Sequence, residues 1–263
     1  MFNRFLLATL LAFLLVGCDN GNDSFVFTNP ATAQAATEPF VFAYSGDNGP
    51  GFWYEGGHPD CLPQGMQSPV NITNTVVDGS LAPLDLRLGN SPIFLKNNGH
   101  GLQLVYQEGS SLHLDGATYL LRQIHFHTLS EHTVEGQRPV MEMHLVCEDP
   151  SSGRLAVVAR FYDVGSTSSF LSAFSDELPQ KNGDTFESPA LIDVGNDFSG
   201  LNRYYTYMGS LTTPPCSNIV TWLVLKEHST LSEEQYDAFR TVMGNNFRPL
   251  QKISGRVIRE TTF

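Results

Sequence analysis

The sequence predicts a single, mainly β domain with a few short helices. Short runs rich in apolar and β-branched residues, such as 101–106, 155–162 and 219–226, are typical of strands. Clusters of Gly, Pro, Asn and Asp separate these runs and indicate turns. No Pro/Gly-rich break, composition shift or internal repeat divides residues 40–263, so one domain with one sizeable core is expected.

Two segments carry helix signals. The clearer one covers residues 232–240, where Ser232 can cap the first turn and Glu233 and Glu234 complement the positive end of the helix dipole. A second, shorter helix is predicted for residues 168–174. These two segments supply the short helices of the expected fold.

The N-terminal residues 1–17 are typical of a signal peptide. Arg4 supplies the positive charge, and the apolar run 5–16 is too short to span a bilayer. Residues 15–18, Leu-Val-Gly-Cys, resemble the bacterial lipobox, in which Cys18 becomes the lipid-modified first residue. Cleavage after residues 33–35, Ala-Gln-Ala, is the alternative, but that site lies far from the apolar run. Residues 18–39 are polar and are expected to form a flexible tether. Together, the signal peptide and the lipobox predict an exported lipoprotein of the periplasm or cell envelope.

The charge of the chain excludes some classes of partner. The formal net charge is −12, and removal of Arg4 with the signal peptide makes it −13. An acidic surface does not suit nucleic acid, whose phosphates need a basic patch, or electrostatic docking to anionic lipid. We therefore expect membrane contact only through a lipid anchor at Cys18. Nothing in the sequence specifies the oligomeric state.

Three histidines indicate a metal site. His125 and His127 are two positions apart, so on a strand they share a face, and His144 lies in a second strand-like segment. Three imidazoles from neighbouring strands can hold one Zn²⁺ and leave its fourth position open, as catalytic zinc sites do. Gln123 and Glu142 each lie two positions before a histidine, where they can accept its second ring N–H. The pattern predicts a metalloenzyme built on a sheet.

The spacing of these residues in the sequence does not by itself exclude other ligand sets. A His-x-His pair on a strand is often an ordinary surface or core pair. His132 competes with His144 as third ligand, but it follows a turn-like segment, 128–130, that leaves its direction unspecified. Spacing favours His144, and three imidazoles suit zinc, although other divalent ions can occupy such sites.

Six motifs, taken in order, resemble the α-class carbonic anhydrases of the bacterial exported type. They are Gln67–Ile72 (QSPVNI), Asn97–His100 (NNGH), Gln123–His127 (QIHFH), Ser130–Val134 (SEHTV), Glu142–Val146 (EMHLV) and Ser210–Pro215 (SLTTPP). The resemblance covers residues 44–259. It implies that residues 40–263 form the catalytic domain, built around a large, twisted, mostly antiparallel central sheet.

The resemblance also implies an activity and a set of ligands. The activity is the reversible hydration of the small molecule CO₂ to bicarbonate and a proton by zinc-bound hydroxide, a lyase reaction, with weak esterase activity as a side reaction. The implied zinc ligands are His125, His127 and His144, which excludes His132. Gln123 and Glu142 would support His125 and His144, and the carbonyl of Asn246 would support His127. The alternatives are a zinc hydrolase of esters and a non-catalytic binding protein on the same fold.

Further roles follow from the same resemblance. The Thr212 hydroxyl would donate to Glu131 and accept from the attacking oxygen, which orients that oxygen, and His100 would carry protons to solvent. The residues implied in substrate contact are Val146, Val157, Leu211, Thr213 and Trp222, and those implied in ordering the waters of the proton path are Tyr44, Asn98 and Gln103. Gln103 stands where many relatives have asparagine, and Phe42 stands where many have tryptophan.

The remaining cysteines receive two different expectations. Cys61 and Cys216 lie in loop-like segments of an exported chain, and they match the disulfide pair of exported family members. Cys147 follows the His144 segment on its opposite face and is expected to be a buried free thiol.

Overall fold

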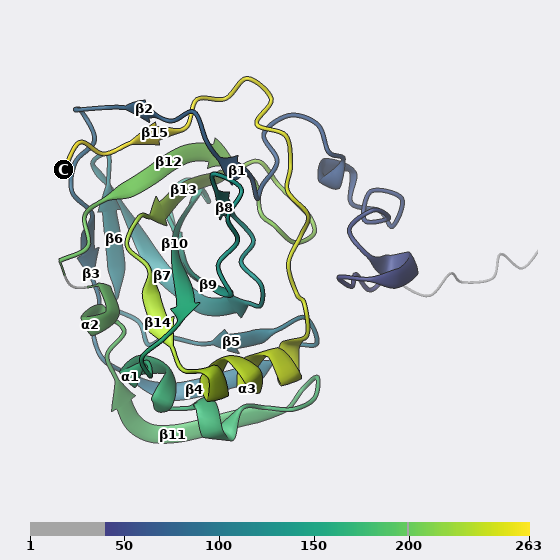
Figure 1. The fold of residues 1–263 in the computed structure, drawn as a ribbon, viewed down its shortest axis with the longest axis vertical. Helices are drawn as coiled ribbons and strands as arrows, with labels where there is room; N and C mark the ends of the chain where they lie inside the picture. Colours follow the sequence, from purple (N-terminus) through teal and green to yellow (C-terminus); the bar gives the residue numbers. More distant parts are fainter. Residues whose placement is uncertain (1–39, 199) are drawn as a thin grey trace, which may run out of the picture. The chain divides into compact units, whose positions relative to one another are not determined.

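The structure is a computed structural model that describes residues 40–198 and 200–263 (Figure 1). The predicted signal peptide (1–17), the tether (18–39) and the lipidation site Cys18 lie outside the described residues, so these remain predictions. In the described part of the chain, no helix is both long enough and apolar enough to cross a membrane.

A 13-stranded mixed sheet dominates the described residues. Its main path runs β11-β4-β5-β7-β9-β10-β13-β12-β15-β2. The strands on this path are β11 (Thr185–Ile192), β4 (Ser91–Asn97), β5 (Leu102–Leu104), β7 (Ala117–His127), β9 (Met141–Glu148), β10 (Leu155–Val164), β13 (Val220–Leu225), β12 (Tyr204–Gly209), β15 (Arg259–Glu260) and β2 (Val76–Val77). Off the path, β6 (Ser111–Leu114) pairs with β7 and with β3 (Asp85–Arg87), and β14 (Ser229–Leu231) pairs with β10.

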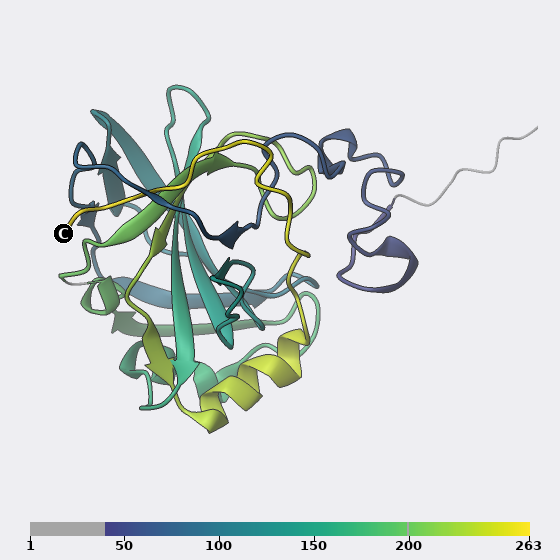
Figure 2. The ribbon, with the colours of Figure 1, turned by 45° about the horizontal axis from the view of Figure 1, so that its top comes forward.

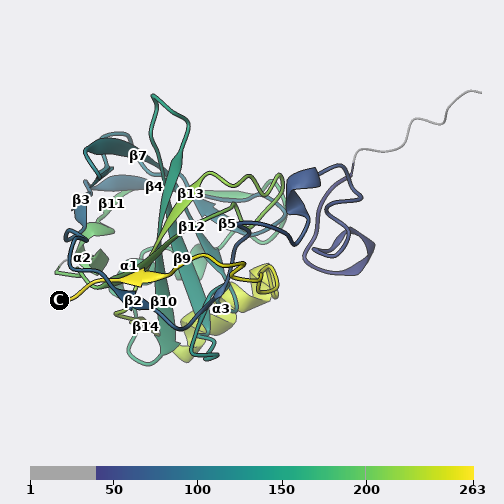
Figure 3. The same ribbon diagram turned by 90° about the horizontal axis from the view of Figure 1, so that it is seen from above.

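Most strand pairs in this sheet are antiparallel, and the exceptions are β10 with β13, β10 with β14, and β15 with β2. The strand direction turns progressively across the sheet (Figure 2, Figure 3), as the right-handed twist of strands requires. A separate two-stranded sheet joins β1 (Asn71–Ile72) to β8 (Thr133–Val134). The predicted mainly β fold around a large, mostly antiparallel central sheet is confirmed.

The central strands are buried on both faces, which explains their nearly continuous apolar sequences. On one face, Leu145 and Val158 belong to the main core, which also takes in Phe239 of the helix α3 (Glu233–Met243). On the other face, Val157 and Trp222 belong to a second cluster. The histidines of the metal motif lie on this second face, so the helix α3 and the predicted site contact opposite faces of the central strands.

Both predicted helices form. The Ser232 hydroxyl caps α3 by accepting the Gln235 backbone N–H, and the Gln235 side-chain oxygen accepts the Ser232 backbone N–H, which makes a capping box. The short α1 (Ser169–Ser172) begins at Ser168, whose hydroxyl accepts from the Leu171 N–H. The remaining helical turns are α2 (Gly195–Phe198) and the 3₁₀ segments η1 (Gly46–Asn48), η2 (Pro59–Cys61) and η3 (Ser175–Glu177).

The cysteines of the described residues have the expected states. Cys61 and Cys216, separated by 155 residues, form a disulfide beside the buried Trp53. Cys147 is a buried free thiol, and burial raises its pKa to about 12. A thiol with so high a pKa is rarely a thiolate near neutral pH, so Cys147 is expected to be unreactive in the folded protein.

The disulfide should contribute measurably to stability, because it closes a long loop in the unfolded chain. Replacing both Cys61 and Cys216 with alanine should lower the free energy of unfolding by about 2–5 kcal/mol. The measurement is urea denaturation of the oxidised protein and of the double variant, each with and without dithiothreitol. The reductant should shift the midpoint of the parent protein only. Equal midpoints for the oxidised protein and the double variant would contradict the prediction.

Candidate metal centre

The pairing of β7 with β9 brings the three histidines of the motif together. His125 lies directly opposite His144, and His127 lies opposite Glu142. The register shifts between Leu121 and Gln123, so a bulge precedes the histidine segment of β7. From Gln123 onward the alternation is regular, and Gln123, His125 and His127 therefore share one face of the sheet with His144.

Each histidine uses one ring nitrogen for support and turns the other toward its neighbours. His125 Nδ1 lies 2.9 Å from Gln123 Oε1, His127 Nδ1 lies 2.7 Å from the Asn246 carbonyl oxygen, and His144 Nε2 lies 2.7 Å from Glu142 Oε1. These are the three supporting contacts that the resemblance implied. They leave Nε2 of His125, Nε2 of His127 and Nδ1 of His144 as the possible ligand atoms.

The converging nitrogens fit a zinc ion. The ligand atoms of His125, His127 and His144 all lie within 4.8 Å of one another, and His125 Nε2 is 3.1 Å from His144 Nδ1. Two nitrogens on one tetrahedral zinc stand roughly 3.3 Å apart for the usual bond length of 2.0–2.1 Å. Burial lowers the pKa of both His125 and His127, which keeps the rings neutral, as ligation requires.

Two buried polar atoms next to this group also lack a partner among the described residues. They are His127 Nε2 and Glu131 Oε2, and they face each other across 3.5 Å. Buried polar atoms are rarely left unpaired without a functional reason, such as an ion that binds there. The donor set and these unpaired atoms both agree with a zinc ion held by three imidazoles.

His132, which competes with His144 as third ligand on spacing alone, has both ring nitrogens engaged. Its Nδ1 lies 2.7 Å from Glu142 Oε1 and its Nε2 lies 2.6 Å from the Tyr207 hydroxyl. The ligand atoms of His132, Glu142 and His144 do lie close enough for a metal. However, an ion there would have to displace two short hydrogen bonds, whereas His125 and His127 offer a free nitrogen each.

Glu142 receives four N–H groups. Its Oε2 accepts the backbone N–H groups of Glu131 and His132, each at 2.8 Å, and its Oε1 contacts the rings of His132 and His144. Burial by itself would raise the pKa of Glu142, but the charges and hydrogen bonds of His132 and His144 outweigh burial, and the pKa lies well below its usual value. Glu142 is therefore an ionised carboxylate that can only accept hydrogen bonds.

Glu131 and Thr212 are both buried, and Glu131 faces His127. Glu131 Oε1 accepts the backbone N–H of Arg248 at 2.8 Å, a contact that the sequence gave no sign of. The hydrogen bond expected from Thr212 to Glu131 is not formed among the described residues, where Glu131 Oε2 has no partner. The joint role of Thr212 and Glu131 stays a prediction.

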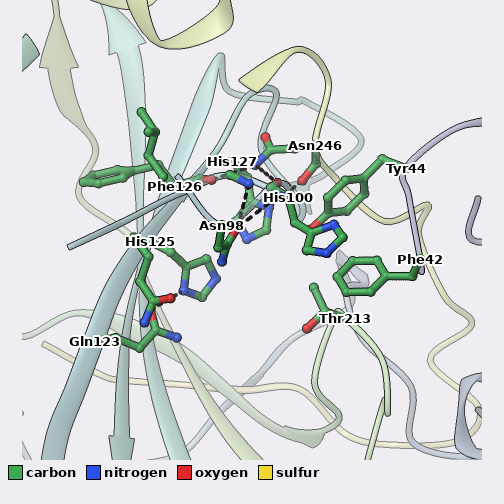
Figure 4. A pocket seen from close by; sticks show the side chains of 13 residues that line it. Phe42, Tyr44, Asn98, His100, Gln123, His125, Phe126, His127, Thr213 and Asn246 are labelled. Atoms are coloured by element: carbon green, nitrogen blue, oxygen red, sulfur yellow. Dashed lines mark hydrogen bonds between the residues drawn. The ribbon is translucent and has the colours of Figure 1, made fainter. Parts of the chain in front are cut away.

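A cavity of about 240 Å³ opens over the histidines (Figure 4). It is lined by Phe42, Tyr44, Asn98, His100, Gly101, Leu102, Gln103, Gln123, His125, Phe126, His127, Thr213 and Asn246. All four residues assigned to the proton path are in this set. The ring of His100 stacks on Phe42, with centroids 3.7 Å apart and an angle of 12° between the rings. Sequence reasoning did not predict that contact, which involves residues 58 positions apart (100 − 42).

One of the proton-path residues has a structural role as well. Asn98 Oδ1 accepts the backbone N–H groups of His100 and Gly101, each at 3.0 Å. The side-chain oxygen therefore shapes the turn that carries His100, and only the Asn98 amide NH₂ is left to hold water. Asn-Gly-rich turns of this kind are common, so the residue types alone could have suggested it.

Comparison with known proteins identifies the family. The eukaryotic-type carbonic anhydrase family model matches residues 48–262. A carbonic anhydrase of Neisseria gonorrhoeae is 38% identical over 197 residues, which cover 74% of this chain and 77% of that protein. The chain belongs to the eukaryotic-type carbonic anhydrase family.

Solved structures agree with this family. The α-carbonic anhydrase of Photobacterium profundum superposes with a TM-score of 0.79 at 36% identity, covering 83% of this chain and all of that one (100%). The α-carbonic anhydrase of Thermovibrio ammonificans, solved with the inhibitor sulfanilamide, gives a TM-score of 0.79 at 35% identity and covers 83% of this chain and 98% of that one.

An apolar row runs beside the histidines, as a carbonic anhydrase needs for an uncharged substrate. Val146, Val157 and Trp222 are successive register partners across β9, β10 and β13. Val146 lies two residues from His144 on one face, about 6.6 Å along the strand. The Trp222 ring lies 4.9 Å from the His144 ring between centroids. Leu211 packs against the same cluster, and of the five predicted substrate residues only Thr213 lines the cavity itself.

The Glu142 contacts predict its importance for metal affinity. Glu142→Gln replaces an acceptor-only group with one that also carries an NH₂, so one of its N–H neighbours must lose its bond. We expect the zinc dissociation constant to rise about 10–100-fold. The measurement is competition with a chromophoric chelator. Glu148→Gln is the matched control, because Glu148 ends the same strand and only pairs with the exposed Arg122. A loss of affinity equal in both variants would contradict the assignment.

Proposed function

We propose that this protein catalyses the zinc-dependent, reversible hydration of CO₂ to bicarbonate and a proton. The observation that carries the proposal is the convergence of three imidazole nitrogens beside a cavity, each on a ring whose second nitrogen is held by an acceptor. Family membership supports the reaction, because sequence relatives such as those of Neisseria gonorrhoeae and Klebsiella pneumoniae are named carbonic anhydrases. Zinc, when bound, makes hydroxide available near neutral pH by lowering the pKa of a water ligand.

The protein's own residues would position the reactants. Val146, Val157 and Trp222 pack beside the His144 ring and make that side of the site apolar, which suits CO₂ because it needs no hydrogen-bond donor to bind. Glu131, fixed by the Arg248 N–H, has one oxygen left for a donor, and Thr212 is our candidate for that donor. A hydroxyl that donates to Glu131 must accept from the attacking oxygen, which orients that oxygen toward CO₂.

His100 would remove the proton that each hydration releases. It lines the cavity and is half-buried, so it can exchange protons with both cavity water and solvent. Burial lowers its pKa below the usual 6.5. The ring is therefore mostly neutral at pH 7 and ready to accept a proton, and its stacking on Phe42 defines one resting position.

The two alternatives predict different results. A hydroxide at this site can also attack an activated ester, so weak esterase activity is expected as a side reaction. An ester turnover far above CO₂ hydration would favour a hydrolase. A protein purified without chelator and free of zinc would favour a non-catalytic binding protein on the same fold.

Loss of a ligand should abolish both zinc binding and hydration. For His144→Ala we expect zinc content near zero and a fall in CO₂ hydration of roughly a hundredfold or more, because two imidazoles cannot complete the site. Metal analysis and stopped-flow hydration measure these. A sulfonamide such as sulfanilamide should inhibit the parent protein. His228→Ala, at an exposed histidine bonded to Asp163, is the control and should keep its zinc and activity. Full zinc content in His144→Ala would contradict the ligand assignment.

The proton-transfer role of His100 can be separated from the chemical step. His100→Ala should slow CO₂ hydration about tenfold in weak buffer, because general acid–base transfer of this kind is lost. Added imidazole should restore the rate. Since the pKa of His100 is lowered, the part of the rate that depends on it should persist at pH 7 and decline only as the pH falls below 6.5. A rate independent of buffer in His100→Ala would exclude His100 as the shuttle.

A further inference from the structure

A chain of buried hydrogen bonds continues beyond Glu142 to strand β12. The Tyr207 side chain is 3% exposed, and its hydroxyl lies 2.6 Å from His132 Nε2 and 2.9 Å from Ser68 Oγ. Ser68 Oγ in turn accepts the backbone N–H of Ser210 at 3.1 Å. The chain therefore begins at a backbone amide and ends, through His132 and Glu142, at the ring of His144.

The backbone at Gly209 leaves room for the hydrogen bond between Ser68 and Tyr207. Ser68 reaches β12 beside Gly209, where a Cβ would lie only 2.2 Å from Ser68 Oγ. A side chain at this position would push Ser68 away from Tyr207. The absence of one permits the serine hydroxyl to sit against the strand, which is a close approach that only glycine allows.

The sense of each hydrogen bond follows from counting donors. His144 needs its Nδ1 lone pair for the metal, so its proton is on Nε2 and is donated to Glu142 Oε1. Glu142 is an acceptor at all of its contacts, so His132 must donate from Nδ1 to the same oxygen. With its one ring proton on Nδ1, His132 would present a lone pair at Nε2. The Tyr207 hydroxyl is the group within reach that can donate to it.

Ser68 can donate the hydrogen bond that the Tyr207 hydroxyl accepts. Two hydroxyl groups can bond in either sense, and their other neighbours decide which. Ser68 Oγ already accepts from Ser210, so its own proton is free to point at Tyr207. The protons then run in one direction, from Ser68 through Tyr207 and His132 to the carboxylate.

We propose that Tyr207 is a positioning residue for the zinc site, which it serves by donating to His132 and holding that ring in the Nδ1–H form. This keeps Glu142 supplied with donors, so His144 must present Nε2–H to Glu142 and its Nδ1 lone pair to the metal. The inference rests on the proposed zinc site. Tyr207 touches neither metal nor substrate, and three hydrogen bonds, through His132 and Glu142, separate it from the ring of His144.

The first test is the rate of zinc loss. Tyr207→Phe removes one oxygen and keeps the ring that stacks on Trp222. We expect the zinc-loaded variant to release zinc to excess chelator about 3–10 times faster, less than the 10–100-fold cost of changing a direct partner of a ligand. The control is Tyr205→Phe on the same strand and face, because no hydrogen bond of the Tyr205 hydroxyl occurs among the described residues. Its zinc release should match the parent.

Thermal unfolding of the zinc-free forms of the parent and the variants shows whether a substitution lowers the stability of the whole fold. It therefore separates a positioning role of Tyr207 from a general loss of stability. Equal zinc release from both tyrosine variants, or no acceleration in Tyr207→Phe, would overturn the proposal. A protein that binds no zinc at all would instead refute the proposed function. Ser68→Ala provides a second variant, with Tyr207 still present, and should accelerate zinc release by a smaller factor than Tyr207→Phe.

The second test reads the protons directly and needs no variant. Nitrogen-15 NMR of the histidine rings in the zinc-loaded protein should show His132 protonated at Nδ1 and unprotonated at Nε2. His144 should be protonated at Nε2. A His132 ring protonated at both nitrogens would mean that it donates to Tyr207, and would overturn the proposal whatever the zinc release rates are.

Discussion

The antiparallel pairing of β7 with β9 is the constraint on which the rest of the site depends. It sets His125 opposite His144 and His127 opposite Glu142 in one register, so the ligand rings and the main supporting carboxylate are placed by a single ladder of backbone hydrogen bonds. A slip of one residue would turn His125 and His127 to the opposite face. The buried, two-faced packing of these strands opposes such a slip, since it would also turn residues such as Phe126 out of the main core.

Buried polar groups carry this constraint outward to distant segments. The stretch 246–248 gives its Asn246 carbonyl to His127 and its Arg248 N–H to Glu131. The Arg248 guanidinium, itself 1% exposed, donates to Gln67 Oε1, to the Ser68 carbonyl and to the Cys61 carbonyl. Each of these acceptors would be costly to leave unpaired in the interior. The disulfide loop and the site are thus parts of one hydrogen-bonded network.

The mainly β fold class and the common face of His125 and His127 could be predicted from the sequence because both rest on local patterns, whereas the exclusion of His132 as third ligand needed the family resemblance. The spacing of two in His125 and His127 fixes their common face, and apolar runs mark the strands. Contacts between residues far apart in the sequence produce no local pattern of this kind. The Asn246 carbonyl lies 119 residues from His127, and Tyr207 lies 75 residues from His132. Family resemblance supplied the first of these contacts, whereas Tyr207 became visible only when the sheet placed β12 beside β13.

The same sheet also separates the two chemical demands of the proposed reaction. The row Val146, Val157 and Trp222 presents apolar surface on one side of the histidines, which suits a substrate without charge. The cavity lining at His100 and Asn98 is polar, which suits a departing proton. Strands β9, β10 and β13 build the apolar row, and the loop after β4 builds the polar lining at His100 and Asn98. A change in one of these regions therefore need not disturb the other. The apolar side proposed for CO₂ and the polar side proposed for proton release can therefore be adjusted independently around the three histidines that the β7–β9 register holds in place.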